Sequence, residues 1–236
     1  MEIFRVCAAR HAGALTSSGR ANRWNSDGRF VIYAGSSRSL ATLELIVHKS
    51  SISPTVPYRV IVISIADDDR LVRQIQINQL PGDWRTIFAY PRLQTIGDTW
   101  YDNQETLILK VPSVIITQEY NYVINTEHPD YAASLNSLGA IYANMGDYKS
   151  AEPYYKQALE IRKKILGEEH PDYAESLHSL GAFYRNIGDY KSAEPYYKQA
   201  LEIRKKLLGE EHPDYATSLN SLGILYSNMG DYKSAE

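Results

Sequence analysis

The sequence predicts an α+β domain, a mixed sheet with helices, followed by an all-α solenoid. Two observations support this prediction. Strand-like runs rich in β-branched residues recur through residues 1–127, without the regular strand–helix alternation of a doubly wound sheet. From His128 onward, a 42-residue segment is repeated almost unchanged, and a period of that size is typical of helical solenoids. We therefore expect one domain over residues 1–127 and repeats over 128–169, 170–211 and, in part, 212–236.

The composition is that of an ordinary globular protein and excludes several functional classes. The net charge is −3, and the two parts hold 13 Lys+Arg with 12 Asp+Glu and 12 with 16, so we expect neither nucleic acid nor a membrane surface as a partner. The first residues, MEIFRV, do not resemble a signal peptide, and no apolar run approaches the roughly 18 residues of a membrane helix. Cys7 is predicted to be a buried thiol. These features predict a cytoplasmic protein.

Hydrophobic patterning predicts the elements of the first domain. The predicted strands are Glu2–Ala8, Phe30–Ala34, Tyr58–Ile65, Leu107–Ile116 and Glu119–Asn125. The third of these is dominated by β-branched residues, which predicts a strand that is covered on both faces. Pro112 in the fourth indicates a bend or a position at the sheet edge. A helix is expected around residues 84–90.

The segment after the second strand is predicted to form an amphipathic helix. Ser36 or Ser37 can cap its N-terminus. Leu40, Leu43 and Val47 follow at the spacing of a core-facing stripe.

Glu44 falls on this same stripe, with His48 one turn later. A carboxylate among core leucines costs several kcal/mol unless it is paired or solvated in a cleft. A glutamate and a histidine that both face inward therefore indicate a site.

Motifs of the common nucleotide and metal enzymes are absent from the sequence. It contains no G-x-G-x-x-G, no G-K-[ST] and no H-E-x-x-H, and its six histidines form no local cluster. A dehydrogenase, a P-loop NTPase and a zinc hydrolase are therefore disfavoured, and we expect no metal.

Residues 1–131 resemble the RES domain, the toxin half of bacterial RES–Xre toxin–antitoxin pairs. The matching segments are RWNSDG at 23–28, VIYA at 31–34, LATLELIVH at 40–48, IGDTW at 96–100, KVPSVI at 110–115 and EYNYVINTEHPDY at 119–131. Each segment is weak alone, but the order and spacing of all six make the resemblance specific.

The resemblance implies a fold similar to ADP-ribosyltransferase toxins and breakdown of NAD⁺. It maps the arginine, glutamate and serine that give the family its name onto Arg23, Glu44 and Ser113, with Tyr33 as a fourth site residue. Asn25, His48 and Asn121 are expected to bind NAD⁺ or to support the residues that do. Two departures from the family pattern are visible: Ala21 and Asn22 replace glycines, and Thr126 replaces a proline.

The residue types suit this chemistry. Arg23 offers donors that match a pyrophosphate, and Tyr33 offers an aromatic face on which nicotinamide can stack. Cleavage of the ribosyl–nicotinamide bond develops positive charge on the ribose, which Glu44 would stabilise. Ser113 could hydrogen-bond the substrate without acting as a nucleophile. NAD⁺ is thus expected as a substrate, not as a bound cofactor.

Each site residue also has a purely structural interpretation. Arg23 could form a structural ion pair, Tyr33 could be a core residue at a strand end, and Ser113 could be a turn serine. His48 could interact with the carbonyl groups at the C-terminus of its helix. Glu44 is the hardest to explain structurally.

The repeated unit predicts two helices. The two complete copies differ at positions 133, 136, 141, 143, 145 and 165, so 36 of 42 residues are identical. Pro129 suits the start of a helix, and Gly146 and Gly167 suit helix ends. With its HPDYA and ALEIRKK segments, the unit resembles the kinesin-light-chain type of tetratricopeptide repeat (TPR).

A second helix face carries the positions that vary between copies. Its candidate groove residues are Asn136, Glu175, His178, Arg185 and Asn220. Such variation is what a groove that binds protein or peptide ligands would show, and neutral drift at solvent positions would show it equally.

Two functional hypotheses follow. The first is an NAD⁺-consuming, toxin-like enzyme (a glycohydrolase, phosphorylase or ADP-ribosyltransferase) with a TPR interaction module. The alternative is a non-catalytic TPR adaptor that carries a degenerate RES domain. The family resemblance implies an Xre-type antitoxin as a partner and leaves a homodimer open.

Overall fold

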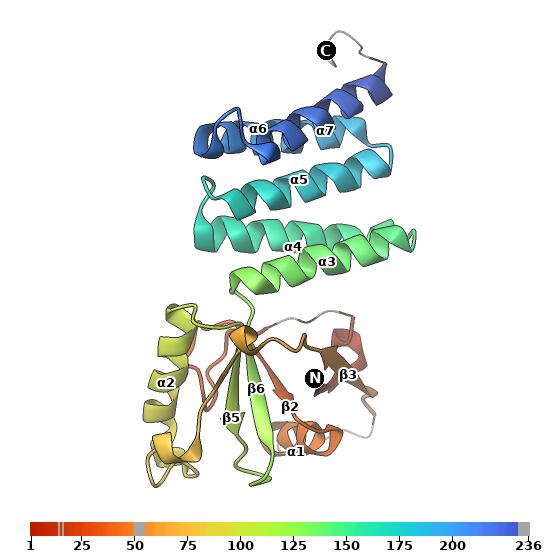
Figure 1. Cartoon of the computed structure of the whole chain (residues 1–236). Coiled ribbons are helices and arrows are strands. Elements are labelled where there is room, and N and C mark those ends of the chain that lie inside the picture. The colour runs from red at the N-terminus through yellow and green to blue at the C-terminus, as the bar shows by residue number, and fades with distance from the viewer. Residues whose placement is uncertain (14, 16, 50–54, 231–236) are drawn as a thin grey trace. The chain divides into compact units, whose positions relative to one another are not determined.

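We describe a computed structural model of the chain, which covers residues 1–13, 15, 17–49 and 55–230, without the side chains of residues 48 and 49. The chain divides into two compact units, Met1–His128 and Pro129–Glu236. Figure 1 shows that the first unit combines a sheet with helices and that the second is helical.

The first unit is built on a six-stranded mixed sheet with the order β3-β1-β2-β6-β5-β4. The strands are β1 (Glu2–Ala8), β2 (Val31–Gly35), β3 (Tyr58–Ser64), β4 (Val72–Gln74), β5 (Ile108–Pro112) and β6 (Tyr120–Asn125). All described pairings are antiparallel except β4 with β5. The five predicted strands are present, and the expectation of a mixed sheet with helices is confirmed.

The prediction that Tyr58–Ile65 is covered on both faces is wrong. β3 is an edge strand that pairs with β1, and Val60 and Val62 are 46% and 43% exposed. A run of β-branched residues favours a strand, but it does not determine whether another element packs against it. Pro112 is the last residue of β5, which lies inside the sheet, so the proline ends the strand there.

Two helices pack on this sheet. Helix α1 (Arg38–Lys49) lies against β1 and β2, and α2 (Tyr90–Asp102) covers β5 and β6. The helix expected around residues 84–90 is therefore misplaced, because this segment holds only a short 3₁₀ turn, Ile87–Ala89, before α2 begins. Pro91 at the start of α2 is consistent with a helix N-terminus.

Ser37 caps α1, because the backbone N–H of Leu40 donates to its hydroxyl oxygen at 3.0 Å. The predicted core stripe is partly wrong. Leu40 is fully buried, but Leu43 is 38% and Val47 61% exposed. Compared with the predicted stripe, the inward face of α1 is shifted by one residue, since Ala41 is buried beside Leu40 and Glu44 is half-buried.

The main core of the first unit lies between α2 and the sheet. It joins Leu93 and Trp100 of α2 to Leu109 of β5 and Val123 of β6, with Trp24 from the loop before β2. All five side chains are at most 2% exposed. The loop that carries Arg23 is therefore anchored in the core by its neighbour Trp24.

The second unit confirms the prediction of two helices per repeat. Its helices are α3 (Pro129–Asn144), α4 (Tyr148–Leu166), α5 (Pro171–Asn186), α6 (Tyr190–Leu208) and α7 (Pro213–Met229). Asp147 and Asp189 cap α4 and α6 through their carboxylates. The predicted stop Gly146 has a positive φ of 78°, which favours glycine over other residues. The last residues, 231–236, lie outside the described part.

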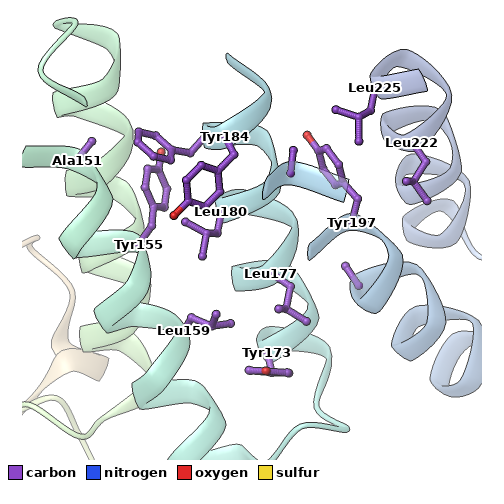
Figure 2. Close-up of a cluster of buried hydrophobic side chains, with 13 residues drawn as sticks. Ala151, Tyr155, Leu159, Tyr173, Leu177, Leu180, Tyr184, Tyr197, Leu222 and Leu225 are labelled. Atoms are coloured by element: carbon purple, nitrogen blue, oxygen red, sulfur yellow. The ribbon is translucent and has the colours of Figure 1, made fainter. Parts of the chain in front are cut away.

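Tyrosines, leucines and alanines make up most of the repeat core (Figure 2). Tyr155 and Tyr197 occupy equivalent positions and pack over Gly139 and Gly181, where an added Cβ would lie 3.0 Å from the tyrosine ring. These contacts account for the predicted packing of large residues against glycine and alanine positions.

Candidate active site

A cavity of about 410 Å³ opens where β1 and β2 separate. The described register pairs these strands at Phe4 with Gly35, whereas β1 pairs with β3 along its whole length and β2 with β6. The strands therefore splay beyond the Phe4–Gly35 pair, and residues of both strands line the cavity with residues of α1. Backbone groups that would bond in a closed sheet can serve a ligand there.

Glu44 and Asn121 meet at this cavity. Both residues line it, and the Asn121 side-chain amide donates to Glu44 Oε1 at 2.6 Å. Asn121 lies on β6, opposite Gly35 of β2, so a residue 77 positions away orients the carboxylate. Glu44 lies on the inward face of α1 with Leu40 and Ala41, and it therefore points toward the cavity.

Tyr33 also lines the cavity, and its hydroxyl is engaged elsewhere. The hydroxyl donates to Asn25 Oδ1 at 2.7 Å and accepts from the backbone N–H of Trp24 at 3.3 Å. Burial raises the pKa of Tyr33 far above its usual value, and the charge of Glu44 adds to this effect. Tyr33 can therefore offer its ring to a ligand while its hydroxyl stays protonated.

Asn25 holds the loop behind Tyr33. It is 1% exposed, and its amide donates to the carbonyl oxygens of Arg20 and Ser26 at 2.9 and 3.0 Å. Asn25 therefore contacts Tyr33 and the loop and is not among the described lining residues, so its role at the site stays a prediction.

Helix α2 clamps the loop that carries Arg23. A Cβ added to Gly97 would lie 1.7 Å from the Trp24 carbonyl oxygen, so only glycine allows this approach. Asp98 accepts from the Ser26 backbone N–H at 3.0 Å and from its hydroxyl at 2.5 Å. The IGDTW segment thus has a positioning role.

The structure places the Arg23 side chain away from the cavity, outside its described lining. Its Nη1 donates to the Trp84 carbonyl oxygen at 2.9 Å, and its guanidinium lies 4.5 Å from the centroid of the Tyr90 ring. These contacts tie the loop to the segment before α2 and to the first residue of α2. The structural ion pair considered from the sequence is replaced by a backbone contact and a cation–π contact.

Ser113 is fully buried in the turn after β5. Its hydroxyl oxygen accepts from the backbone N–H groups of Ile115 and Ile116, each at 3.1 Å. It is also outside the described lining, so this conformation gives Ser113 the turn role that the sequence allowed. The His48 side chain lies outside the described part of the chain.

Several lining residues were missed by sequence reasoning. They are Arg5, His11, Ser17, Ser18 and Asn22. Arg5 carried a usable signal, because an arginine inside the apolar strand segment EIFRVCA is unusual. His11 ends a short 3₁₀ helix after β1, and the other three lie in the loop that follows. This region has no periodicity, so only the fold brings the four residues to the cavity.

The two departures from the family pattern have structural consequences. Asn22 Oδ1 accepts from the Arg23 backbone N–H at 2.8 Å, so its side chain stabilises the loop at the cavity rim. Thr126 donates from its N–H and its hydroxyl to the Phe30 carbonyl oxygen at 3.1 and 2.7 Å. Its hydroxyl also contacts that of Ser17 at 3.0 Å, which connects a cavity residue to the end of β6.

The candidate groove residues of the repeats fall into two groups. Asn136 and His178 are half-buried and connect adjacent repeats, through Ser176 at 3.1 Å and Ser221 at 2.9 Å. The remaining residues are partly or fully exposed: Glu175, Arg185 and Asn220.

The residues that the structure describes form neither a cluster of metal ligands nor a membrane-spanning helix. No group of three or more His, Cys, Asp and Glu side chains is placed to hold a metal ion in this part of the chain. None of its helices has both the length and the apolar character required to span a membrane.

Family models match both parts of the chain. The model described as the RES domain matches residues 2–144, more than half of the chain. The tetratricopeptide-repeat model matches residues 130–206 and 176–236. The assignment of both families is therefore confirmed.

Two similar curated proteins match the first part. "Toxin Res" of Yersinia enterocolitica serotype O:8 / biotype 1B (strain NCTC 13174 / 8081) is 32% identical over 145 residues, which cover 58% of this chain and 92% of that protein. "Prs ADP-ribosylating toxin" of Sphingobium sp. (strain YBL2) is 36% identical over 122 residues, which cover 50% of this chain and 73% of that protein.

The repeats resemble a solved structure. The TPR-like repeats of a kinesin light chain from Podosopora anserina are 30% identical, with a TM-score of 0.43. The match covers 46% of this chain and 52% of that one, so the chain spans about half of its length.

Proposed function

The chain belongs to the RES-domain family and carries tetratricopeptide repeats, and we propose that its first unit cleaves the nicotinamide–ribose bond of NAD⁺. The observation that carries this proposal is the Glu44 carboxylate, which the Asn121 amide orients at 2.6 Å beside a cavity of about 410 Å³. That volume lies within the range of roughly 300–1,000 Å³ that is usual for small-molecule sites.

The reaction requires a fixed negative charge and little covalent chemistry from the protein. As the bond from the ribose C1′ to the nicotinamide nitrogen breaks, the electron pair leaves with nicotinamide and positive charge develops on the ribose. Glu44 would stabilise that charge electrostatically. The ring of Tyr33 would stack on nicotinamide while its hydroxyl remains bonded to Asn25.

The binding of the pyrophosphate is assigned differently from the sequence-based expectation. Arg23 is engaged with Trp84 and Tyr90, whereas Arg5 and His11 are among the lining residues. We assign the phosphate contact to Arg5 and a positioning role to Arg23. Ser113 would act by shaping the turn after β5.

Release of nicotinamide from NAD⁺ by the purified full chain tests this function. We expect Glu44→Gln to lower kcat by about 100-fold or more, the usual scale for loss of transition-state charge stabilisation. Glu2→Gln, a change of the same chemistry at an exposed residue, should leave the rate unchanged. Equal rates for wild type and Glu44→Gln would contradict the proposal.

Two further variants distinguish the proposed role of Arg5 in binding from the proposed role of Arg23 in positioning the loop. Arg5→Gln should raise KM with little effect on kcat, because a phosphate contact is formed in both the ground state and the transition state. Arg23→Gln should lower kcat and protein stability together, because it releases the loop. No loss of NAD⁺ by any variant, wild type included, would favour the alternative of a non-catalytic adaptor.

The acceptor of the ADP-ribosyl group is water, phosphate or a protein side chain. One relative is named an ADP-ribosylating toxin, which supports the third of these. Analysis of the products formed with and without phosphate distinguishes water from phosphate as the acceptor. Labelled NAD⁺ reveals whether a protein side chain is modified. We also propose that an Xre-type antitoxin inhibits this activity. Co-expression of the antitoxin should then restore the growth of cells that produce the chain.

A further inference from the structure

The Glu119 carboxylate contacts the N-terminus of α1, the helix that carries Glu44, although Glu119 is not among the described lining residues of the cavity. Its Oε2 accepts from the hydroxyls of Ser36 and Ser37 at 2.8 and 2.6 Å. Ser37 in turn caps α1, because its oxygen accepts from the Leu40 N–H. The carboxylate therefore holds the start of α1 through two hydroxyls, and its negative charge suits the positive end of the helix dipole.

Two side chains of one short segment contact α1. Glu119 directly precedes β6, and Asn121 is the second residue of that strand. Residues two apart along a strand lie on the same side, so both can reach the helix. Asn121 donates to Glu44 at 2.6 Å, two turns of α1 beyond Ser37. The segment 119–121 thus holds α1 at its cap and at Glu44, and a displacement of the cap would alter the contact between Glu44 and Asn121.

The turn of Ser113 places Glu119 at the start of β6. The Ser113 N–H donates to the Glu119 carbonyl oxygen, and the Glu119 N–H donates to the Ile116 carbonyl oxygen, both at 3.0 Å. The Ser113 hydroxyl closes the same turn by accepting from the N–H groups of Ile115 and Ile116. Ser113 is therefore connected to α1 through Glu119, outside the described lining of the cavity.

We propose that Glu119 is a positioning residue, whose carboxylate sets the place of Glu44 relative to Asn121 through the N-terminus of α1. This role rests on the proposed function, because the activity affected is the cleavage that Glu44 assists. A displacement of about 1 Å in a reacting group can cost on the order of 100-fold in rate. Glu119 does not line the described cavity, so its loss should lower kcat and leave KM nearly unchanged.

Steady-state kinetics of the full chain with NAD⁺ compare three changes at position 119. Glu119→Ala removes the acceptor and should lower kcat by about tenfold or more. Glu119→Asp withdraws the carboxylate by one methylene and should have a smaller effect in the same direction. Glu119→Gln keeps an acceptor oxygen in place and should stay within about fivefold of wild type, the scale of one charge at a helix N-terminus.

A control and a double variant distinguish positioning from a general loss of stability. Glu105→Ala removes a carboxylate that pairs with Arg73 of β4, and it should leave kcat unchanged. In the Glu44→Gln background, Glu119→Ala should lower the remaining rate by less than about twofold, because the charge that it positions is gone. The positioning role is contradicted if Glu119→Ala has the kcat of wild type, if it lowers the rate equally in both backgrounds, or if Glu119→Gln is equally harmful.

The side-chain amide of Asn121 provides a readout that needs no activity. Its proton resonances in the NMR spectrum report the hydrogen bond to Glu44. They should shift in Glu119→Ala and stay in place in Glu119→Gln and Glu105→Ala. A wild-type chain that releases no nicotinamide would contradict the proposed function alone, and these resonances would then decide the role of Glu119. Unshifted Asn121 resonances in Glu119→Ala would overturn it.

Discussion

The backbone of Trp24 lies directly against Gly97 of α2, so closely that a Cβ at position 97 would come within 1.7 Å of the Trp24 carbonyl oxygen. This contact fixes the distance between α2 and the loop of residues 22–28. The loop carries Asn22 at the cavity rim and Asn25 behind Tyr33. A packing contact outside the cavity therefore sets the geometry of the candidate site.

Gly97→Ala should destabilise the first unit, because the added methyl group forces the loop away from α2. We expect a loss of at least about 1–3 kcal/mol in the free energy of unfolding, the usual cost of overpacking. Denaturant unfolding measures it. Gly82→Ala is the matched control, since a Cβ there meets nothing within 4 Å. Equal stability of the two variants would contradict the assigned contact.

Asn121→Ala should lower kcat about 100-fold with little change in KM, because an unsupported Glu44 loses its orientation. Asn121→Asp should be at least as harmful, since it would place a second carboxylate where the amide now donates at 2.6 Å. Asn78→Asp, at an exposed residue, is the control. A rise in KM alone would show that Asn121 serves binding and not the orientation of Glu44.

Thr126→Val retains the shape of the side chain and removes the hydroxyl that joins Ser17 to the Phe30 carbonyl oxygen. We expect a loss of about 0.5–1.5 kcal/mol in the free energy of unfolding, the scale of one hydrogen bond. Because Ser17 lines the cavity, KM for NAD⁺ should rise as well. Chemical denaturation and steady-state kinetics measure the two effects, and Thr42→Val, at a helix-surface hydroxyl, is the control.

His178 should make the repeat unit sensitive to acid. Burial lowers its pKa from 6.5 to about 4, and the charges of Arg204 and Arg185 act in the same direction against the weaker effect of Asp214. The unfolded chain binds a proton at higher pH than the folded chain does. The stability contributed by neutral His178 is thus complete above pH 6.5 and is lost as the pH falls toward 4.

The change should be on the order of 1–2 kcal/mol once solvent screening is allowed for. His178→Asn tests it, because asparagine occupies the equivalent positions 136 and 220. Thermal unfolding between pH 7 and pH 4 should show a smaller fall in melting temperature for this variant. Parallel pH profiles for wild type and His178→Asn would argue against the assignment.

The repeats were predictable because their signals are local. The aspartate caps, the prolines at helix starts and the glycines at helix ends recur every 42 residues, so the sequence alone predicts the helices and their boundaries. The strands of the first unit were also predictable, because patterning over a few residues determines which segments are extended.

The burial of helix and strand faces was less predictable. Leu43, Val47 and Val62 have the residue types of a core but are exposed. Periodicity identifies an apolar face, whereas its burial depends on a partner that the local sequence does not specify. The same limit explains the misplaced helix at residues 84–90, where apolar residues form a turn before α2.

The sequence by itself determined the order of most elements and the repeat architecture, and it identified Glu44 as a candidate site residue. Tertiary structure decided which residues accompany Glu44: Asn121 is 77 positions away in the chain, and Arg5 reaches the cavity because β1 and β2 separate there. It also directed Arg23 toward Trp84 and placed Ser113 in a turn. The physical reason is that strand pairing and packing, which act between distant segments, set the direction of a side chain.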